Sequence, residues 1–153
     1  MGIIVKEDRL FLLNTRNTSY AFFRDDDGIL VQLYWGKKIE RPEDYDTETM
    51  VWEQGYHPAV DKKREECSSF GMMRYKEASM KFIFSDGVRD FRYRMQEYRA
   101  EGDWLDIVLQ DEHYPLRITL HYQVHEELDI IEKWREAENL GEETIGAERI
   151  FSG

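Results

Sequence analysis

The sequence predicts an all-β fold, an antiparallel β-sandwich, and three observations carry that prediction. Aromatic side chains, which favour strands, make up 14% of the 153 residues. Short apolar segments recur along the chain, and several alternate apolar and polar residues with a period of two. Turn-forming pairs such as Asp-Gly separate these segments. With only three prolines and no Gly- or Ser-rich stretch, residues 1–153 are interpreted as a single domain.

Seven or eight strands are expected, and their approximate limits follow from the apolar segments. They cover residues 9–14, 19–24, 29–35, 78–85, 91–96, 104–110 and 116–125. The Asp-Gly pair ending at Gly28 predicts a hairpin, because glycine accepts the positive φ of such turns. In the strand that follows, period-two alternation places Ile29, Val31, Leu33 and Trp35 on one face, opposite Leu30, Gln32 and Tyr34. A second hairpin is expected at Asp86-Gly87.

Residues 129–141 fit two different interpretations. Asp129 can cap a helix, Glu132 can complete a capping box and Gly141 can end it. As a strand, the same residues alternate poorly. The residue pattern alone therefore favours a helix here, in an otherwise β-rich chain.

Residues 37–74 are expected to form a long irregular loop, because they show no sustained period of two or 3.6. Loops of this length are often functional or disordered. Trp52 and Tyr56 lie among polar neighbours within it, and they are the candidate substrate-binding residues. An exposed aromatic ring can stack on a sugar, whereas a buried one only anchors the loop; composition favours anchoring.

Charge and cysteine content limit the class of partner and the compartment. The net charge of −11 argues against a nucleic-acid partner, since phosphate binding needs a basic surface. No apolar stretch reaches the length of a membrane span, and the N-terminus lacks the pattern of a signal peptide. Cys67 is the single cysteine, which fits a reducing, cytoplasmic location.

No residue pattern in the chain nominates a reaction, so we expect no catalytic residue, no metal site and no cofactor. His121 and His125 have the spacing of zinc ligands on a helix, but on a strand they lie about 13 Å apart. They are interpreted as solvent-facing side chains, and Cys67 as a packed thiol without a base beside it. Acidic pairs such as Asp44 and Asp46 are expected by chance among 32 acidic residues.

The order of the segments resembles the N-terminal β-sandwich domain of glycoside hydrolase family 36, the bacterial α-galactosidases. The most specific match is the Gly-x-Leu-x-x-Leu-Tyr-x-Gly-Lys pattern that begins at Gly28. Weaker matches occur, in the expected order, at residues 11–15, 19–23, 70–71, 74–75, 103–111, 116–125 and 139–141. The chain departs from the family at residues 74–79, so no role of the family's Asp or Arg at that place carries over.

The resemblance implies a non-catalytic part of a longer enzyme that hydrolyses terminal α-galactosides with retention. In the family, two catalytic Asp residues lie in a (β/α)₈ barrel that follows the sandwich, and 153 residues are too few to hold both. The chain then looks like a sandwich truncated before its last strands, with residues 129–139 as a strand. Its expected partners are the catalytic barrel and further copies of itself, and its expected roles are structural support, oligomerisation and lining of the substrate site. The alternative is a free-standing sandwich that binds carbohydrate or protein.

Overall fold

Three antiparallel sheets make up the protein in the computed structural model, which describes residues 2–39, 41, 43, 45, 64–71 and 77–151. The first sheet has the order β1-β2-β3-β4 and the second β6-β7-β8-β9, while β5 pairs with β10. The strands are β1 (Ile3–Lys6), β2 (Leu10–Asn14), β3 (Thr18–Arg24), β4 (Leu30–Lys37), β5 (Met80–Ile83), β6 (Tyr93–Glu101), β7 (Trp104–Asp111), β8 (Leu116–His125), β9 (Ile130–Asn139) and β10 (Gly146–Ile150). A 3₁₀ turn, η2 (Glu126–Leu128), joins β8 to β9. The expected all-β, antiparallel sandwich is confirmed.

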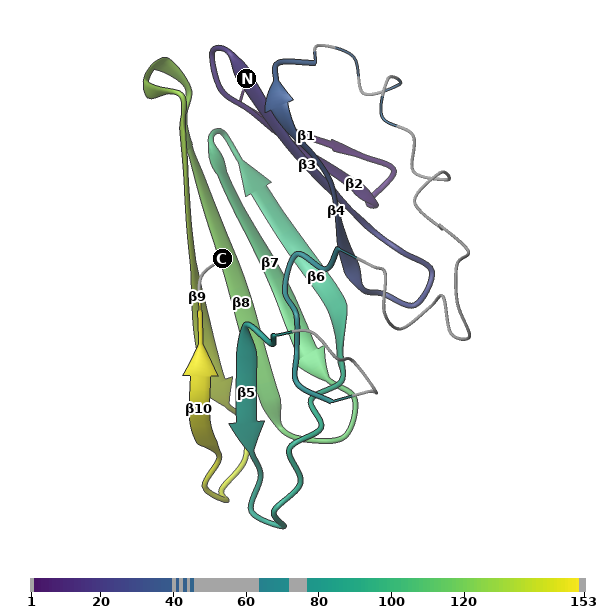
Figure 1. Ribbon diagram of the computed structural model, residues 1–153, viewed down its shortest axis with the longest axis vertical. Coiled ribbons are helices and arrows are strands. Elements are labelled where there is room, and N and C mark those ends of the chain that lie inside the picture. Colours follow the sequence, from purple (N-terminus) through teal and green to yellow (C-terminus); the bar gives the residue numbers. More distant parts are fainter. Residues whose placement is uncertain are drawn as a thin grey trace.

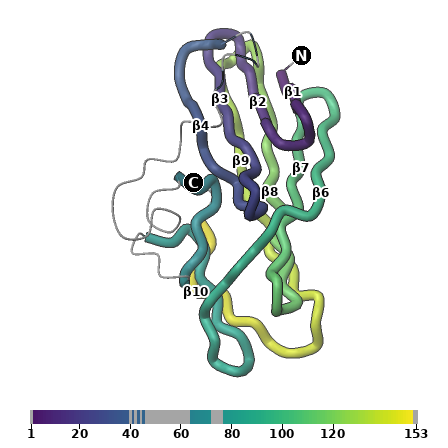
Figure 2. The backbone as a smooth tube through the Cα atoms, turned by 90° about the vertical axis from the view of Figure 1, so that its right-hand side faces the viewer, coloured from purple at the N-terminus to yellow at the C-terminus, as the bar shows by residue number. Residues whose placement is uncertain are grey.

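The two four-stranded sheets face one another (Figure 1). Aromatic rings from both sheets meet in the core between them. Phe22 of β3 stacks on Tyr122 of β8 with ring centroids 5.2 Å apart, and Phe11 of β2 meets Tyr98 of β6 edge to face at 5.3 Å. In the view of Figure 2, the purple first sheet lies in front of β8 and β9. Burying such rings is a main source of stability in a sandwich core.

Strand β8 shows how the pattern of the sequence produces the sheet. Its ten residues alternate buried and partly exposed without a break, so Leu116, Ile118, Leu120, Tyr122 and Val124 all enter the core. The hairpin between β3 and β4 is likewise confirmed, and Gly28 has the positive φ of 79° that its turn requires.

Several local expectations from the residue pattern are wrong. The helix favoured for residues 129–141 is a strand, as the family resemblance implied, because β9 pairs with β8 along its whole length. Asp129 takes a left-handed conformation after η2 instead of capping a helix. The Asp86-Gly87 turn does not join a hairpin: β5 pairs with β10, and β6 pairs with β7. In β4 the pairing register shifts by one residue, so the face expected for Trp35 is also wrong.

Of the expected loop at residues 37–74, the described residues 64–71 run alongside the sheets. Glu65 forms an isolated bridge with Val31, and Ser69 forms one with Met80. The side chains of Glu66 and Cys67 are buried. The middle of this short segment therefore belongs to the packed interior. No helix in the described residues has the length and apolarity to cross a membrane.

Candidate functional site: a pocket between the sheets

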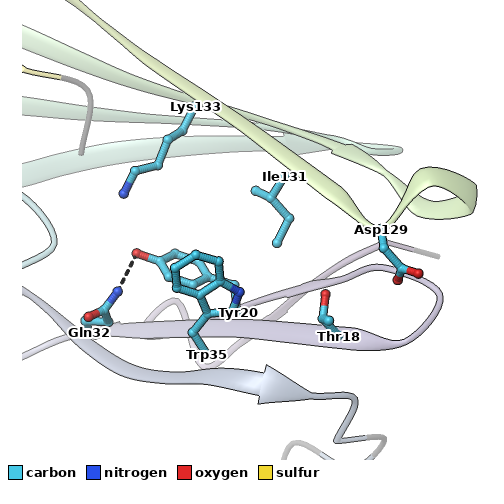
Figure 3. A pocket seen from close by; sticks show the side chains of 7 residues that line it. All are labelled: Thr18, Tyr20, Gln32, Trp35, Asp129, Ile131 and Lys133. Carbon is cyan, nitrogen blue, oxygen red and sulfur yellow. Dashed lines mark hydrogen bonds between the residues drawn. The ribbon is translucent and has the colours of Figure 1, made fainter.

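A pocket of about 420 Å³ opens between the first sheet and the inner face of β9. Figure 3 shows Thr18, Tyr20, Gln32 and Trp35 rising from β3 and β4, and Ile131 and Lys133 descending from β9. Asp129 lies at one end. The size and the mixture of aromatic and polar walls are typical of small-ligand or side-chain binding sites.

A β-bulge in β4 places both Gln32 and Trp35 in this pocket. Phe22 pairs with Gln32 and Ala21 with Tyr34, so Leu33 has no partner on β3. Tyr20 pairs with Trp35, and cross-strand partners share a face. The expectation that Trp35 shares a face with Val31 and Leu33, opposite Gln32, is therefore wrong, because the extra residue shifts the alternation by one.

Trp35 forms the exposed rim of the pocket. Its side chain is 77% exposed, and its ring meets the ring of Tyr20 edge to face at 6.2 Å. A large aromatic side chain left open to solvent beside an apolar wall marks a surface suited to contact with another group.

Two residues that line the pocket, Tyr20 and Lys133, contact a buried carboxylate, that of Glu66. Glu66 Oε1 accepts hydrogen bonds from the Tyr122 hydroxyl and from Lys133 Nζ, each at 2.9 Å. Its Oε2 accepts a short hydrogen bond from the Tyr20 hydroxyl, which itself accepts one from Gln32 Nε2 at 3.0 Å. This network joins the two sheets and the segment 64–71, and its donors compensate the cost of burying the carboxylate.

Burial and the nearby carboxylate keep the tyrosine hydroxyls neutral. Loss of solvent, followed by repulsion from Glu66, raises the pKa of Tyr20 and of Tyr122 far above the usual value of 10.0. Next to them, burial raises the pKa of the Cys67 thiol to about 12. A neutral thiol and neutral phenols are poor nucleophiles, so this network beside the pocket is suited to hold a shape rather than to react.

Asp129 fastens the end of the pocket to the turn between β2 and β3. Its Oδ1 accepts hydrogen bonds from the Thr15 hydroxyl at 2.8 Å and from the Asn17 backbone N–H at 2.7 Å, while Asn17 Nδ2 donates to Oδ2 at 2.5 Å. These bonds, with the backbone N–H of Asn17 first, lower the pKa of the Asp129 carboxyl. These hydrogen bonds use the side chain of Asp129, which therefore does not cap a helix but lies between the 3₁₀ turn and strand β9.

The structure does not place the candidate substrate-binding residues, and it places the two histidines outside the pocket. Trp52 and Tyr56 lie outside the described residues, so their role stays a prediction. His121 contacts Asp106 through Nδ1 at 2.6 Å, and His125 contacts Glu132 through Nε2 at 3.1 Å. The two histidines thus have separate partners, and His121, only 13% exposed, is not the solvent-facing side chain that alternation suggested.

The principal residues of the pocket carried no signal in the sequence. Glu66 lies in the segment interpreted as loop, Lys133 in the segment interpreted as helix, and Trp35 on the wrong face of its strand. Trp35 enters the pocket because of the bulge at Leu33, which no local residue pattern marks.

Comparisons with known proteins place the chain in a family. The model of the glycosyl hydrolase family 36 N-terminal domain matches residues 28–153. A bifunctional α-galactosidase/sucrose kinase from Mediterraneibacter gnavus is 27% identical over 180 aligned residues, which cover 97% of this chain and 19% of that protein. The chain therefore spans about a fifth of the length of this relative.

Solved structures of α-galactosidases share the fold. The enzyme from Lactobacillus brevis superimposes with a TM-score of 0.84 at 20% identity, over 97% of this chain and 24% of that one. The family 36 enzyme AgaB from Geobacillus stearothermophilus gives a TM-score of 0.81 at 20% identity, over 99% of this chain and 24% of that one. Together with the family match over most of its length, these observations show that the chain belongs to the N-terminal domain family of glycosyl hydrolase family 36.

Proposed function

We propose that this chain is the non-catalytic N-terminal β-sandwich of an α-galactosidase that hydrolyses terminal α-galactosides with retention. The observation that carries the proposal is the family match over residues 28–153, in a chain whose curated relative is a bifunctional α-galactosidase/sucrose kinase. On this proposal the catalytic residues belong to a barrel elsewhere in the parent enzyme. Its cytoplasmic location is inferred from the single cysteine and belongs to the same proposal.

The reading frame around the chain provides the first test. It should encode, after Gly153, a Lys-aromatic-Asp motif within a barrel domain. The enzyme expressed from that frame should release galactose from nitrophenyl α-galactoside with retained anomeric configuration, followed by NMR of the product. A frame that ends near Gly153 would contradict the proposal and favour a free-standing binding module.

We further propose that the pocket between the sheets receives a segment of the parent enzyme. The inward residues Ile131 and Lys133 of β9 are only half-buried, and Trp35 opposite them is mostly exposed. An aromatic and apolar surface of this kind is normally covered in a stable protein. A relative about five times longer than the chain supplies ample polypeptide for that cover.

The substitution Trp35→Ala distinguishes a covered pocket from an open one. In the isolated chain the exposed indole loses little contact on truncation, so the midpoint of thermal unfolding should change by no more than a few degrees. In the parent enzyme a buried indole is lost, and a much larger decrease is expected. Equal, small effects in both proteins would show that nothing packs on Trp35.

The third proposal concerns residues 43–74. In the family the sandwich can lend a loop to the active-site entrance of a neighbouring subunit, and Trp52 and Tyr56 would stack there on sugar units beyond the scissile bond. Stacking of this kind contributes about 1 kcal/mol. In the parent enzyme Trp52→Ala should then weaken binding of oligosaccharides several-fold and spare small aryl galactosides. Equal loss for both substrates, or unfolding, would identify Trp52 as a structural anchor.

A further inference from the structure

A second aromatic cluster lies on the outer face of the second sheet, away from the pocket. Trp134 of β9 and Trp104 of β7 pack with ring centroids 5.0 Å apart and planes at 74°. His121 of β8 lies parallel to the Trp134 ring at 5.1 Å, with planes 18° apart. All three side chains are outside the hydrophobic core, and both indoles are partly exposed.

Asp106 fixes the orientation of this cluster. Its Oδ1 accepts a hydrogen bond from Trp104 Nε1 at 2.6 Å and lies 2.6 Å from His121 Nδ1. One carboxylate therefore holds an indole and an imidazole against the side of Trp134. Rings held in place before a ligand arrives lose little conformational entropy on binding.

The geometry leaves one face of the Trp134 ring toward the edge of the sheet. His121 covers the face directed toward β8. Trp104 does not cover the opposite face. Rings stacked on the two faces of Trp134 would have centroids about 10 Å apart, the sum of their distances to Trp134, whereas the ring centroids of Trp104 and His121 are 6.2 Å apart. The remaining face looks outward past β9, which is the edge strand of its sheet in the described part of the chain.

Two carboxylates lie beside Trp134 along its strand. Glu132 and Glu136 lie two residues before and after Trp134 on β9, so their side chains share its face of the sheet. They are 59% and 70% exposed, and each also approaches a histidine: Glu132 contacts His125 at 3.1 Å, and Glu136 lies 3.7 Å from His121 Nε2. Both contacts are to β8, but the carboxylate groups are exposed, and exposed carboxylates beside a partly exposed indole can accept hydrogen bonds from hydroxyl groups.

We propose that the outward face of Trp134, flanked by Glu132 and Glu136, binds a neutral galactosyl ring of an oligosaccharide. In galactose the axial 4-hydroxyl lies on one face of the ring, so the C–H groups of C3, C4 and C5 form an apolar patch on the other face. This patch would stack on the indole. Hydroxyl groups at the rim of the sugar would donate to the two carboxylates. Nearby negative charge disfavours phosphates and other anions. The choice of galactose as the sugar rests on the proposed function, whereas the site itself does not.

Raffinose and sucrose provide a matched pair of probes, because raffinose is sucrose with an added α-galactosyl unit. Each sugar is titrated into the ¹⁵N-labelled chain, and the indole N–H signals of the tryptophans are followed by NMR. We expect a saturable shift of the Trp134 signal with raffinose and weaker binding of sucrose. Equal affinity for both sugars, or no saturable shift, would overturn the proposal.

Three variants locate the site. Trp134→Ala should weaken raffinose binding by about fivefold to tenfold, the loss expected for one stacking contact. Trp134→Phe, which keeps an aromatic ring, should retain part of the affinity and guards against a folding defect in the alanine variant. Trp35→Ala removes the exposed indole of the pocket and tests whether the sugar binds there instead.

Two results would overturn the assignment in an informative way. Loss of binding in Trp35→Ala but not in Trp134→Ala would move the sugar to the pocket between the sheets. Loss of self-association in Trp134→Ala, with sugar binding unaffected, would identify the cluster as a protein interface. Neither result bears on the reading-frame test, so this inference and the proposed function can fail separately.

Discussion

Alkaline unfolding tests the buried network around Glu66 most directly. Tyr20 and Tyr122 have pKa values raised far above 10.0 in the folded chain, while in the unfolded chain they titrate near the usual value. Above pH 10 the unfolded state therefore binds fewer protons than the folded state, and stability falls as the pH rises. Below pH 10 this contribution is fully present.

The magnitude follows from the number of groups. Each tyrosine that stays protonated only in the folded state removes about 1.4 kcal/mol of unfolding free energy per pH unit, so the pair removes about 3 kcal/mol per unit. Cys67, with a pKa raised by burial to about 12, adds a similar loss from about pH 9 upward. The loss reaches about 5 kcal/mol at pH 11, so cooperative unfolding is expected near pH 11 if the total stability is about 5 kcal/mol, and at higher pH if it is greater.

Urea unfolding at a series of pH values measures this slope, and tyrosinate absorbance reports ionisation in the same samples. Tyr122→Phe should lower the slope by about 1.4 kcal/mol per pH unit, whatever it does to stability at neutral pH. Cys67→Ala should remove the part that begins near pH 9. A wild-type slope below about 1.4 kcal/mol per unit above pH 10, or tyrosinate absorbance of both groups appearing before unfolding, would refute the network described here.

Three further outcomes are expected. The purified chain should not hydrolyse nitrophenyl α-galactoside, and turnover that persists above buffer after repurification would contradict this. Asp129→Asn keeps a residue that tolerates the left-handed backbone but removes the charge. Because the pKa of Asp129 is lowered in the folded chain, the wild type should lose more stability than the variant as the pH falls from about 5 to 3. Thermal unfolding at each pH measures the difference. The isolated chain should self-associate through its exposed edges and apolar surface, so that a monomer mass independent of concentration in sedimentation would contradict the expectation.

Strands could be predicted from the sequence where one face is exposed to solvent and the other is buried. The alternation in β8 and the Asp-Gly turn before β4 are local signals, and both appear in the structure as expected. The fold class follows from several such segments, because alternating strands with tight turns have few ways to bury their apolar faces. The family resemblance added the strand at β9.

The remainder depends on contacts between distant residues. Every local rule for a helix is met at Asp129, yet its side chain binds Thr15 and Asn17, more than a hundred residues away. Lys133 faces inward and so breaks the apolar–polar alternation of β9, but its ammonium group forms an ion pair with Glu66 from another segment. Neighbouring residues give no indication that Lys133 pairs with Glu66, so the Glu66 network could not be predicted from the sequence.

The unpaired Leu33 has a consequence for insertions and deletions. In an ordinary strand, losing one residue turns every later side chain to the opposite face. β4 already carries one surplus residue, so deleting Leu33 would let Gln32 and Tyr34 follow one another in a regular ladder, with Trp35 still opposite Tyr20. A homologous protein that lacks one residue at this position can therefore keep the same Tyr20–Trp35 pair. If the domain is to be shortened by one residue, Leu33 is the residue to delete.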